Sequence, residues 1–300
     1  AGNYIGTDAN GTIDRGNKSF GVFVGSGASD NYIGVNGDEE RNVISANGRA
    51  GVQFKHEAHD NHVAGNFIGT ASDGGLLGSD GQSLGAYTSF DPYVNIIGTN
   101  GVGDPAEGNL IAGNSQAGVC VSSGNSNSIR GNAIHSNGEL GIDLGRDGVT
   151  VNDIHDTDTG ANGLQNFPAL SEAFAGVSTR VVGELNSHPN GSFDIDFYAN
   201  SAADPSGFGE GERYLGAITV TANAMGTAVY DALIPSATMP GELITATATD
   251  LAGNTSEFSA PIFANTPPAD SVRGTDNNDF IVFTTDSVTH TIDINWGATI

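Results

Sequence analysis

The chain has 300 residues, 44 of them glycine, and its 35 acidic against 10 basic residues give a net charge of −25. This excess of negative charge makes nucleic acids and anionic lipid surfaces poor partners. No apolar run approaches the roughly 18 residues of a membrane span, and no stretch has a sustained helical period. The sequence therefore predicts an all-β protein with many tight turns and no membrane span.

Residues 1–168 repeat one pattern of asparagine, isoleucine and glycine. An Asn is followed two residues later by Ile, three further on by a second Asn, and then by Gly with a β-branched residue. Full copies begin at Asn42, Asn109 and Asn132, and half-copies lie between them. The period is 23 or 24 residues, interrupted by longer loops such as residues 69–92. A period of this length without helix predicts a β-solenoid, in which each coil stacks on the one before.

Alternation within the predicted strands assigns their side chains to two faces. The inward residues are expected to be Val22, Val24, Val52, Phe54, Val119, Val121, Ile142 and Leu144. The outward residues between them are Phe23, Gln53, Cys120 and Asp143. Asparagine at equivalent corners suits tight turns and can pair its amide with the coils on either side. The repeated asparagines are therefore interpreted as structural.

Residues 145–168 form an acidic hinge in which the apolar period stops. Ca²⁺ takes roughly six to eight oxygen ligands, which clustered carboxylates and amides can supply. Candidate ligands for a structural calcium ion are Asp147, Asn152, Asp153, Asp156, Asp158 and Asn162. Their spacing is not that of an EF-hand, so an ordinary solvated acidic loop remains the alternative.

Residues 169–264 change to short alternating strands. The expected strands cover residues 179–185, 193–199, 214–221, 228–233, 243–250 and 257–263. Strands at these intervals predict an antiparallel β-sandwich of the immunoglobulin-like kind. Within it, Asp194 and Asp196 alternate with apolar residues and are expected on a solvated face, and residues 204–212 are expected to be a polar loop.

Residues 265–300 are expected to be a proline-containing linker and a strand-like tail. Asp276 and Asp279, in the segment Arg-Gly-Thr-Asp-Asn-Asn-Asp-Phe-Ile, are further candidate calcium ligands. A single unit of this kind cannot form a roll alone, because neighbouring turns share each ion.

Several of these segments resemble known families. Asn-Tyr-Ile-Gly-Thr, Glu-Arg-Asn-Val-Ile-Ser-Ala-Asn and Gly-Ile-Asp-Leu-Gly resemble bacterial right-handed parallel β-helix repeat proteins. Residues 243–259 resemble the last hairpin of bacterial immunoglobulin-like modules, and residues 273–281 resemble one nonapeptide unit of RTX proteins. The resemblance implies a right-handed parallel β-helix followed by an immunoglobulin-like β-sandwich. It leaves the function open, because the fold serves polysaccharide enzymes, phage tailspikes and adhesins alike.

No catalytic or organic-cofactor site is assigned. Hydrolysis of a polysaccharide needs two carboxylates at a defined separation, and the predicted outward row supplies one. No arginine-rich groove is evident, and a polyanionic sugar would be repelled by the net charge. His56, His59 and His62 recur every third residue and would bind a transition metal only if their segment loops; solvated side chains are the alternative. Cys120, the only cysteine, is expected to be structural.

The sequence favours an extracellular structural or adhesive protein, secreted or on the cell surface, that is part of a surface layer or fibre and is stabilised by calcium. The solenoid ends and the tail are expected to support end-to-end assembly into a homo-oligomer or filament, or excision from a longer fibre. The alternative is a polysaccharide lyase, epimerase, glycoside hydrolase or polysaccharide-binding protein that uses an outer face of the β-helix.

Overall fold

The computed structural model describes residues 2–34, 40–77, 82–101, 105–267, 280–285 and 288–293. The chain divides into two compact units, Ala1–Asn265 and Thr266–Ile300. The helical elements described in full are two short 3₁₀ turns, Pro105–Glu107 and Ala161–Leu164. The predicted all-β class is therefore confirmed. None of the described helices has the length and apolar character needed to cross a membrane.

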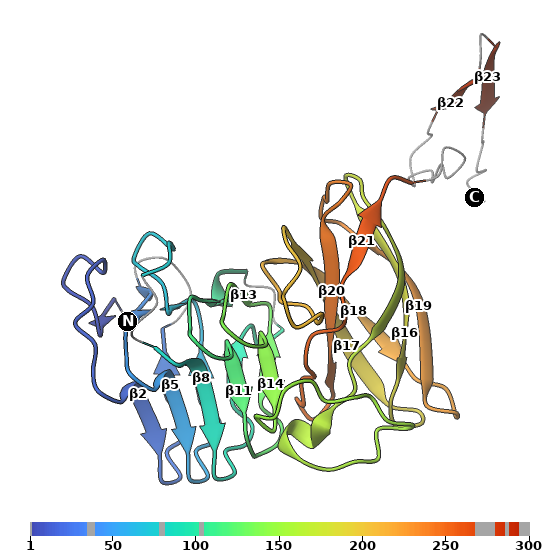
Figure 1. Ribbon diagram of the computed structural model, residues 1–300. Helices are drawn as coiled ribbons and strands as arrows, with labels where there is room; N and C mark the ends of the chain where they lie inside the picture. Colours follow the sequence, from blue (N-terminus) through green and yellow to red (C-terminus); the bar gives the residue numbers. More distant parts are fainter. Residues whose placement is uncertain are drawn as a thin grey trace, which may run out of the picture. The chain divides into compact units, whose positions relative to one another are not determined.

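The first 144 residues build three parallel sheets, and each coil of the chain contributes strands to them in turn (Figure 1). One sheet contains β1 (Tyr4–Ile5), β4 (Val43–Ile44), β7 (Phe67–Ile68), β10 (Leu110–Ala112) and β13 (Ala133–His135). The second contains β2 (Phe20–Gly25), β5 (Ala50–Lys55), β8 (Leu84–Ser89), β11 (Val119–Val121) and β14 (Ile142–Leu144). The third contains β3 (Tyr32–Ile33), β6 (His62–Val63), β9 (Ile96–Gly98) and β12 (Ser128–Arg130). This stacking of parallel strands is that of a β-solenoid.

The predicted inward residues line the core of the coils. Val52, Phe54, Val119 and Val121 are fully buried, and all eight predicted positions belong to or pack against one apolar cluster. The outward row is in register from strand to strand: Phe23, Gln53, Tyr87, Cys120 and Asp143. Gln53, Cys120 and Asp143 are nevertheless buried, because neighbouring side chains cover that part of the face.

One coil was missed in the sequence. Residues 69–92 were expected to be a loop, but β8 lies inside them and pairs with both β5 and β11. The prediction failed because Ala86 and Thr88 occupy the inward positions where the other coils have larger apolar residues. Thr88 is fully buried, and its hydroxyl donates a hydrogen bond to the carbonyl of Ser123 at 3.1 Å. The polar group is thereby satisfied inside the coil.

Side-chain amides form three ladders along the corners of the coils. In most steps the backbone N–H and the side-chain amide of one residue donate to the amide oxygen of the next. The first ladder is Asn3, Asn42, Asn66, Asn109 and Asn132. The second is Asn17, Asn47, Gln82, Asn114 and Asn137. The third is Asn31, Asn61, Asn95, Asn127 and Asn162. The corner role predicted for asparagine is confirmed.

In four of the Asn-x-Ile segments a glycine follows the Ile and makes room for these ladders: Gly6, Gly34, Gly69 and Gly98. Gly98, for example, has a φ of +101°, which is open to glycine but strained for other residues. A Cβ atom there would also collide with the carbonyl of Arg130 and crowd the amide of Asn132. In each Ile-Gly pair, the Ile thus packs in the core and the Gly lets two neighbouring coils approach closely.

Residues 169–265 form one seven-stranded sheet of order β18-β17-β20-β21-β15-β16-β19 (Figure 1). Its strands are β15 (Ala169–Phe174), β16 (Thr179–Asn186), β17 (Ser192–Asn200), β18 (Arg213–Thr221), β19 (Thr227–Ile234), β20 (Leu243–Asp250) and β21 (Ile262–Asn265). All neighbours are antiparallel except β15 and β21. The edge strands β18 and β19 contact each other, so the sheet curls back on itself around a second apolar core.

Two strand predictions in this region were wrong. β15 was not expected, and the strand expected at residues 257–263 is replaced by an extended segment followed by β21. The segment leaves the sheet because Glu257 and Phe258 contact the coils, as described below. In the second unit, β22 (Phe280–Thr285) and β23 (Val288–Asp293) pair antiparallel. The candidate ligands Asp276 and Asp279 lie outside the described residues.

Replacing Asn109 by Ala should lower the free energy of unfolding by about 3 kcal/mol, since buried partners lose their hydrogen bonds. Its amide donates to Asn132 and to the Val63 carbonyl and accepts from Asn66. Urea unfolding followed by circular dichroism measures the effect. Asn17→Ala, at the exposed start of another ladder, is the matched control and should cost less than about 1 kcal/mol. Equal losses in the two variants would contradict the ladder's role.

Candidate functional site

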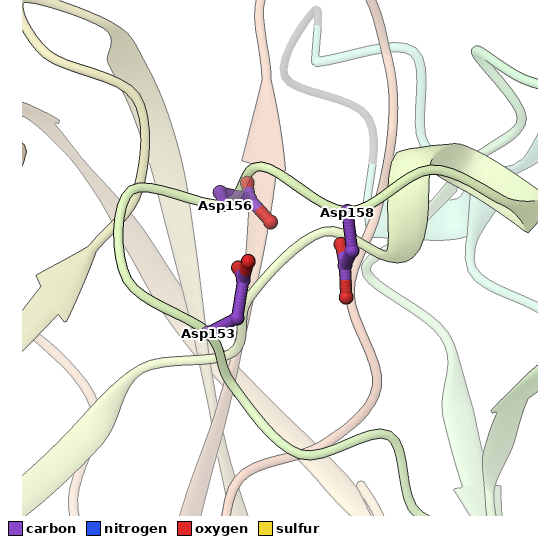
Figure 2. Close-up of side chains that lie close together, drawn as sticks. All are labelled: Asp153, Asp156 and Asp158. Carbon is purple, nitrogen blue, oxygen red and sulfur yellow. The ribbon is translucent and has the colours of Figure 1, made fainter.

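The carboxylates of Asp153, Asp156 and Asp158 come together in the loop between the coils and the sheet (Figure 2). Ligand oxygens of the three residues lie within 4.8 Å of one another. Within the described ranges, this is the one group of three or more His, Cys, Asp or Glu residues close enough to share a metal ion. The structure therefore unites three of the six hinge residues that the sequence analysis selected.

Hydrogen bonds within the loop and to the sheet hold these carboxylates in place. Asp153 accepts from the backbone N–H and the hydroxyl of Thr157 at 3.1 and 2.8 Å. Asp156 accepts from the backbone N–H of Asn166 at 3.1 Å and from the hydroxyl of Ser187 at 2.6 Å. Asp156 also has a φ of +55°, in the left-handed region that Asp tolerates better than most residues. The turn thus directs the three side chains toward one another.

The environment of the cluster disfavours its negative charge. Burial raises the pKa of Asp156, although the Ser187 hydroxyl acts in the opposite direction. Burial also raises the pKa of Asp158, and the charge of Asp153 adds to the shift. Oδ1 of Asp158 is buried and has no hydrogen-bond partner in the described part of the chain. A hard divalent cation would supply that partner and neutralise the repulsion, so the three carboxylates fit Ca²⁺ chemically.

The other three hinge candidates, Asp147, Asn152 and Asn162, lie outside this cluster. The carboxamide of Asn152 exchanges two hydrogen bonds with the backbone of one residue later in the hinge. Asn162 is fully buried as the last member of the third ladder, and its oxygen accepts the N–H of Asn127 at 3.0 Å. The backbone N–H of Asp147 donates to the carboxylate of Asp143. These residues shape the loop and lie outside the three-carboxylate cluster.

The three histidines have separate partners. The ring of His56 lies 4.8 Å, between centroids, from Phe90. His59 stacks on Tyr93 at the same distance. A ring nitrogen of His62 lies 2.7 Å from a carbonyl oxygen of the next coil. Among the described residues no metal-sized cluster includes a histidine.

Cys120 is fully buried in the second sheet of the coils. Burial raises the pKa of its thiol to about 12, so the reactive thiolate is scarce at neutral pH. This environment agrees with the structural role expected for Cys120.

The sheet domain closes the end of the coil stack, beginning with a carboxylate on the second ladder. Glu210 accepts the backbone N–H groups of Ser136 and Asn137 at 2.8 and 3.1 Å. Beside it, Gly211 exchanges two backbone hydrogen bonds with Ile134 of β13, at 2.7 and 2.8 Å. Burial raises the pKa of Glu210 to about 6. A segment expected to be a polar loop thus provides an edge for the first sheet.

Glu257 and Thr255 close the other two sheets. Glu257 accepts the N–H of Leu144 in β14 and the N–H of Thr150, both at 2.9 Å. The hydroxyl oxygen of Thr255 accepts the N–H of Ile129 in β12 at 2.9 Å. Burial raises the pKa of Glu257 to about 7. Each of the three coil sheets therefore ends on a group of the sheet domain.

Two aromatic rings and one arginine complete this contact between the last coil and the sheet domain, which we call the joint. Tyr198 and Phe258 belong to the apolar core of the coils and meet edge to face with centroids 5.2 Å apart. Arg130, at the end of β12, donates two hydrogen bonds to Asp196 at 2.7 and 3.0 Å. It also pairs with Asp194. The face expected to be solvated is therefore covered at Asp196, which is fully buried.

Comparison with known proteins adds little. No family model matches the sequence, and no curated protein matches it. Among solved structures, chitinase ChiW from Paenibacillus sp. str. FPU-7, described as a bacterial cell-surface-expressed multi-modular enzyme machinery, is 9% identical with a TM-score of 0.20. The match covers 82% of this chain and 24% of that chain, so this chain spans about a quarter of that protein's length. A likeness at this level carries no conclusion about function.

The joint predicts a specific pH dependence. The pKa of Glu257 is raised from 4.5 to about 7, so its contribution to stability is fully present below pH 4.5 and is lost as the pH rises through 7. Glu257→Gln cannot ionise. We therefore expect the free energy of unfolding of the wild type to fall relative to that of the variant between pH 4.5 and 7, by up to about 3 kcal/mol.

Urea unfolding at closely spaced pH values measures this difference. Glu139→Gln, which removes an exposed carboxylate from the same last coil, is the control and should follow the wild-type profile. Parallel wild-type and Glu257→Gln profiles would show that Glu257 does not titrate in the joint as proposed.

Proposed function

We propose that this chain is part of an extracellular structural or adhesive protein, a stiff segment of a cell-surface layer or fibre. The observation that carries the proposal is the joint between the coils and the sheet. Backbone donors in all three coil sheets find acceptors in the next domain. A chain that fixes consecutive domains without a flexible linker is suited to holding its parts at a set distance, as a spacer must.

The outer face of the coils supports this proposal over the enzymatic alternative. Asp143 is the one carboxylate in the described outward row of the second sheet, and it is only 4% exposed. Hydrolysis of a glycosidic bond needs a second carboxylate across from the first. His56 packs on an aromatic ring, His59 pairs with the adjacent Asp60 outside this row, and Cys120 is buried. The described residues thus offer no assembled acid–base pair on this row.

The family assignment is part of the proposal. The repeated Asn-x-Ile-Gly motif and its amide ladders support a right-handed parallel β-helix of the bacterial repeat family. The seven-stranded sheet, mostly antiparallel and curled around one apolar core, supports an immunoglobulin-like module. Both are proposed at the level of family, because the comparisons supply no relative.

Calcium is proposed to bind Asp153, Asp156 and Asp158 and to stiffen the hinge. The ion would bridge three carboxylates of one loop, of which Asp156 is also tied to Ser187 of the sheet domain. Its effect would be structural, since it would replace mutual repulsion with shared coordination. The buried, unpartnered oxygen of Asp158 supports this assignment.

Calcium should raise the melting temperature of the wild-type chain, and chelation by EGTA should reverse the increase. Asp158→Asn should abolish the calcium-dependent shift. In EGTA the same variant should be at least as stable as the wild type, because burial disfavours the charge it removes. Differential scanning fluorimetry measures both effects, with the exposed Asp30→Asn as control. A wild-type melting temperature that is indifferent to calcium and EGTA would remove calcium from the proposal.

End-to-end assembly is the further part of the proposed role. Strands β1, β2 and β3 are the outer strands of their sheets in the described part of the chain. At the joint, carboxylate, hydroxyl and backbone carbonyl oxygens accept hydrogen bonds from the N–H groups of the last coil. Similar groups could pair with the outer strands at the other end of the stack. A second copy, or a preceding part of a longer fibre, would use the same chemistry.

The functional test compares assembly with catalysis. We expect electron microscopy and light scattering of the purified chain to show concentration-dependent filaments. We also expect no new reducing ends or unsaturated sugars after incubation with neutral and acidic polysaccharides. A monomer at all concentrations that releases such products would replace the structural role with the enzymatic alternative.

A further inference from the structure

Three of the ten basic residues line one groove on the outside of the coils. The groove has a volume of about 460 Å³, and its lining includes Arg49, Lys55 and Arg146. Aromatic rings of Phe20, Tyr87 and Phe90 form part of the same lining. Two glutamines, two serines and Leu84 complete the lining, and none of its described residues is acidic. In a chain of net charge −25, this local composition is the reverse of the average surface.

The three groove cations differ from three other arginines of the chain in having no carboxylate partner among the described residues. Arg130, Arg180 and Arg213 pair with carboxylates elsewhere in the molecule. In the described part of the chain, no ion pair within 4.0 Å involves the cations of the groove.

Aromatic rings position two of the groove cations instead. Nζ of Lys55 lies 4.6 Å from the ring centroid of Phe90, and the guanidinium of Arg146 lies 5.6 Å from that of Tyr87. Their positive charges therefore remain available to an external anion.

The groove crosses the stack of coils. Phe20 lies on β2, Lys55 on β5 and Tyr87 on β8, and Arg146 follows β14. Neighbouring strands are roughly 4.8 Å apart, so the five strands from β2 to β14 extend over about 19 Å. That length suits several units of a linear polymer. The face also repeats in register, which suits a ligand that repeats as well.

We propose that this groove binds an acidic polysaccharide, with its carboxylate or sulfate groups at the cations and its sugar rings against the aromatic side chains. Ser83 and Gln116, the half-buried polar side chains of the lining, suit the sugar hydroxyls. The net charge of −25 by itself predicts repulsion of such a polymer. However, charges more than about 8 Å apart are largely screened at physiological salt, so the unpaired cations dominate inside the groove. The inference deepens the proposed adhesive role, on which the choice of a polysaccharide rests.

Nucleic acid is the disfavoured polyanion. Double-stranded DNA carries one charge per roughly 1.7 Å, which meets the surrounding acidic surface more strongly than a polymer with one charge per sugar. The amide and hydroxyl side chains of the groove also match a hydroxyl-rich ligand. DNA binding is therefore one of the outcomes that the experiment separates.

Isothermal titration calorimetry of the full chain tests the proposal. The probes are a galacturonate hexamer, a heparin hexasaccharide, neutral cellohexaose and a 20-base-pair DNA duplex. One or both acidic hexamers should bind, with an affinity that falls as salt rises. Cellohexaose and DNA should bind at least tenfold more weakly. The two acidic probes distinguish a carboxylated from a sulfated polymer.

Matched variants locate the site. Arg49→Gln/Lys55→Gln should weaken binding of the acidic hexamer about tenfold, and Phe90→Ala should weaken it as well. Arg15→Gln/Arg213→Gln removes the same total charge outside the groove and should leave binding unchanged. Melting temperatures show that each variant is folded. The assembly assay above does not involve the groove, so its failure and a failure of binding are separate results.

Three outcomes would overturn the proposal. They are no binding of either acidic hexamer, equal binding of cellohexaose or DNA, and equal losses in the groove and control variants.

Discussion

A stack of parallel coils satisfies its backbone hydrogen bonds internally and leaves a row of unpaired N–H groups at its last coil. In this protein those donors decide how the rest of the chain is built. Ile134, Leu144 and Ile129 sit in three different sheets, and each donates to a group of the following domain. Because the three acceptors come from two segments of one curled sheet, that sheet has little freedom to move against the coils. The sheet domain therefore continues the hydrogen bonding of the coils and is not attached to them by a flexible linker.

The chemistry of the ladders explains why carboxylates appear at this end. A carboxamide accepts a hydrogen bond on one side and donates on the other, so each asparagine passes an unsatisfied donor to the next coil. A carboxylate only accepts, and it accepts two N–H groups at once. Glu210 therefore ends a ladder that Asn137 would otherwise leave open. Burial disfavours the negative charge of Glu210 and raises its pKa. Ending the ladder with a carboxylate therefore costs some electrostatic free energy.

Local regularity decided how much of this could be predicted from the sequence. The solenoid follows from repeated spacing, because identical offsets force identical packing at Ile44, Ile111 and Ile134. The coil containing β8 was missed where Thr88 replaced an apolar residue and its hydroxyl found a carbonyl instead. All three carboxylates of the hinge cluster were among the six candidate residues selected from composition, and the other three candidates lie outside the cluster. Asn162, however, belongs to a ladder whose preceding member, Asn127, lies 35 residues away, which composition does not reveal.

The joint and the groove were not predicted from the sequence because each brings together residues that are far apart in the chain. Glu210 and Asn137 are 73 residues apart, and nothing in the segment around Glu210 repeats. Arg49 and Arg146 are likewise far apart in the chain, but both flank strands of the same sheet, which aligning the coils would have revealed.

The net charge of the chain was a misleading guide to which ligands its surface can bind. It averages over a surface on which paired cations serve the fold and unpaired ones gather in one place. In an acidic chain with few cations, most cations are neutralised by a nearby carboxylate. Two of the three groove cations are held over aromatic rings, and none of the three has an ion pair within 4.0 Å in the described residues. The groove therefore marks the part of the surface where an external anion is the missing partner.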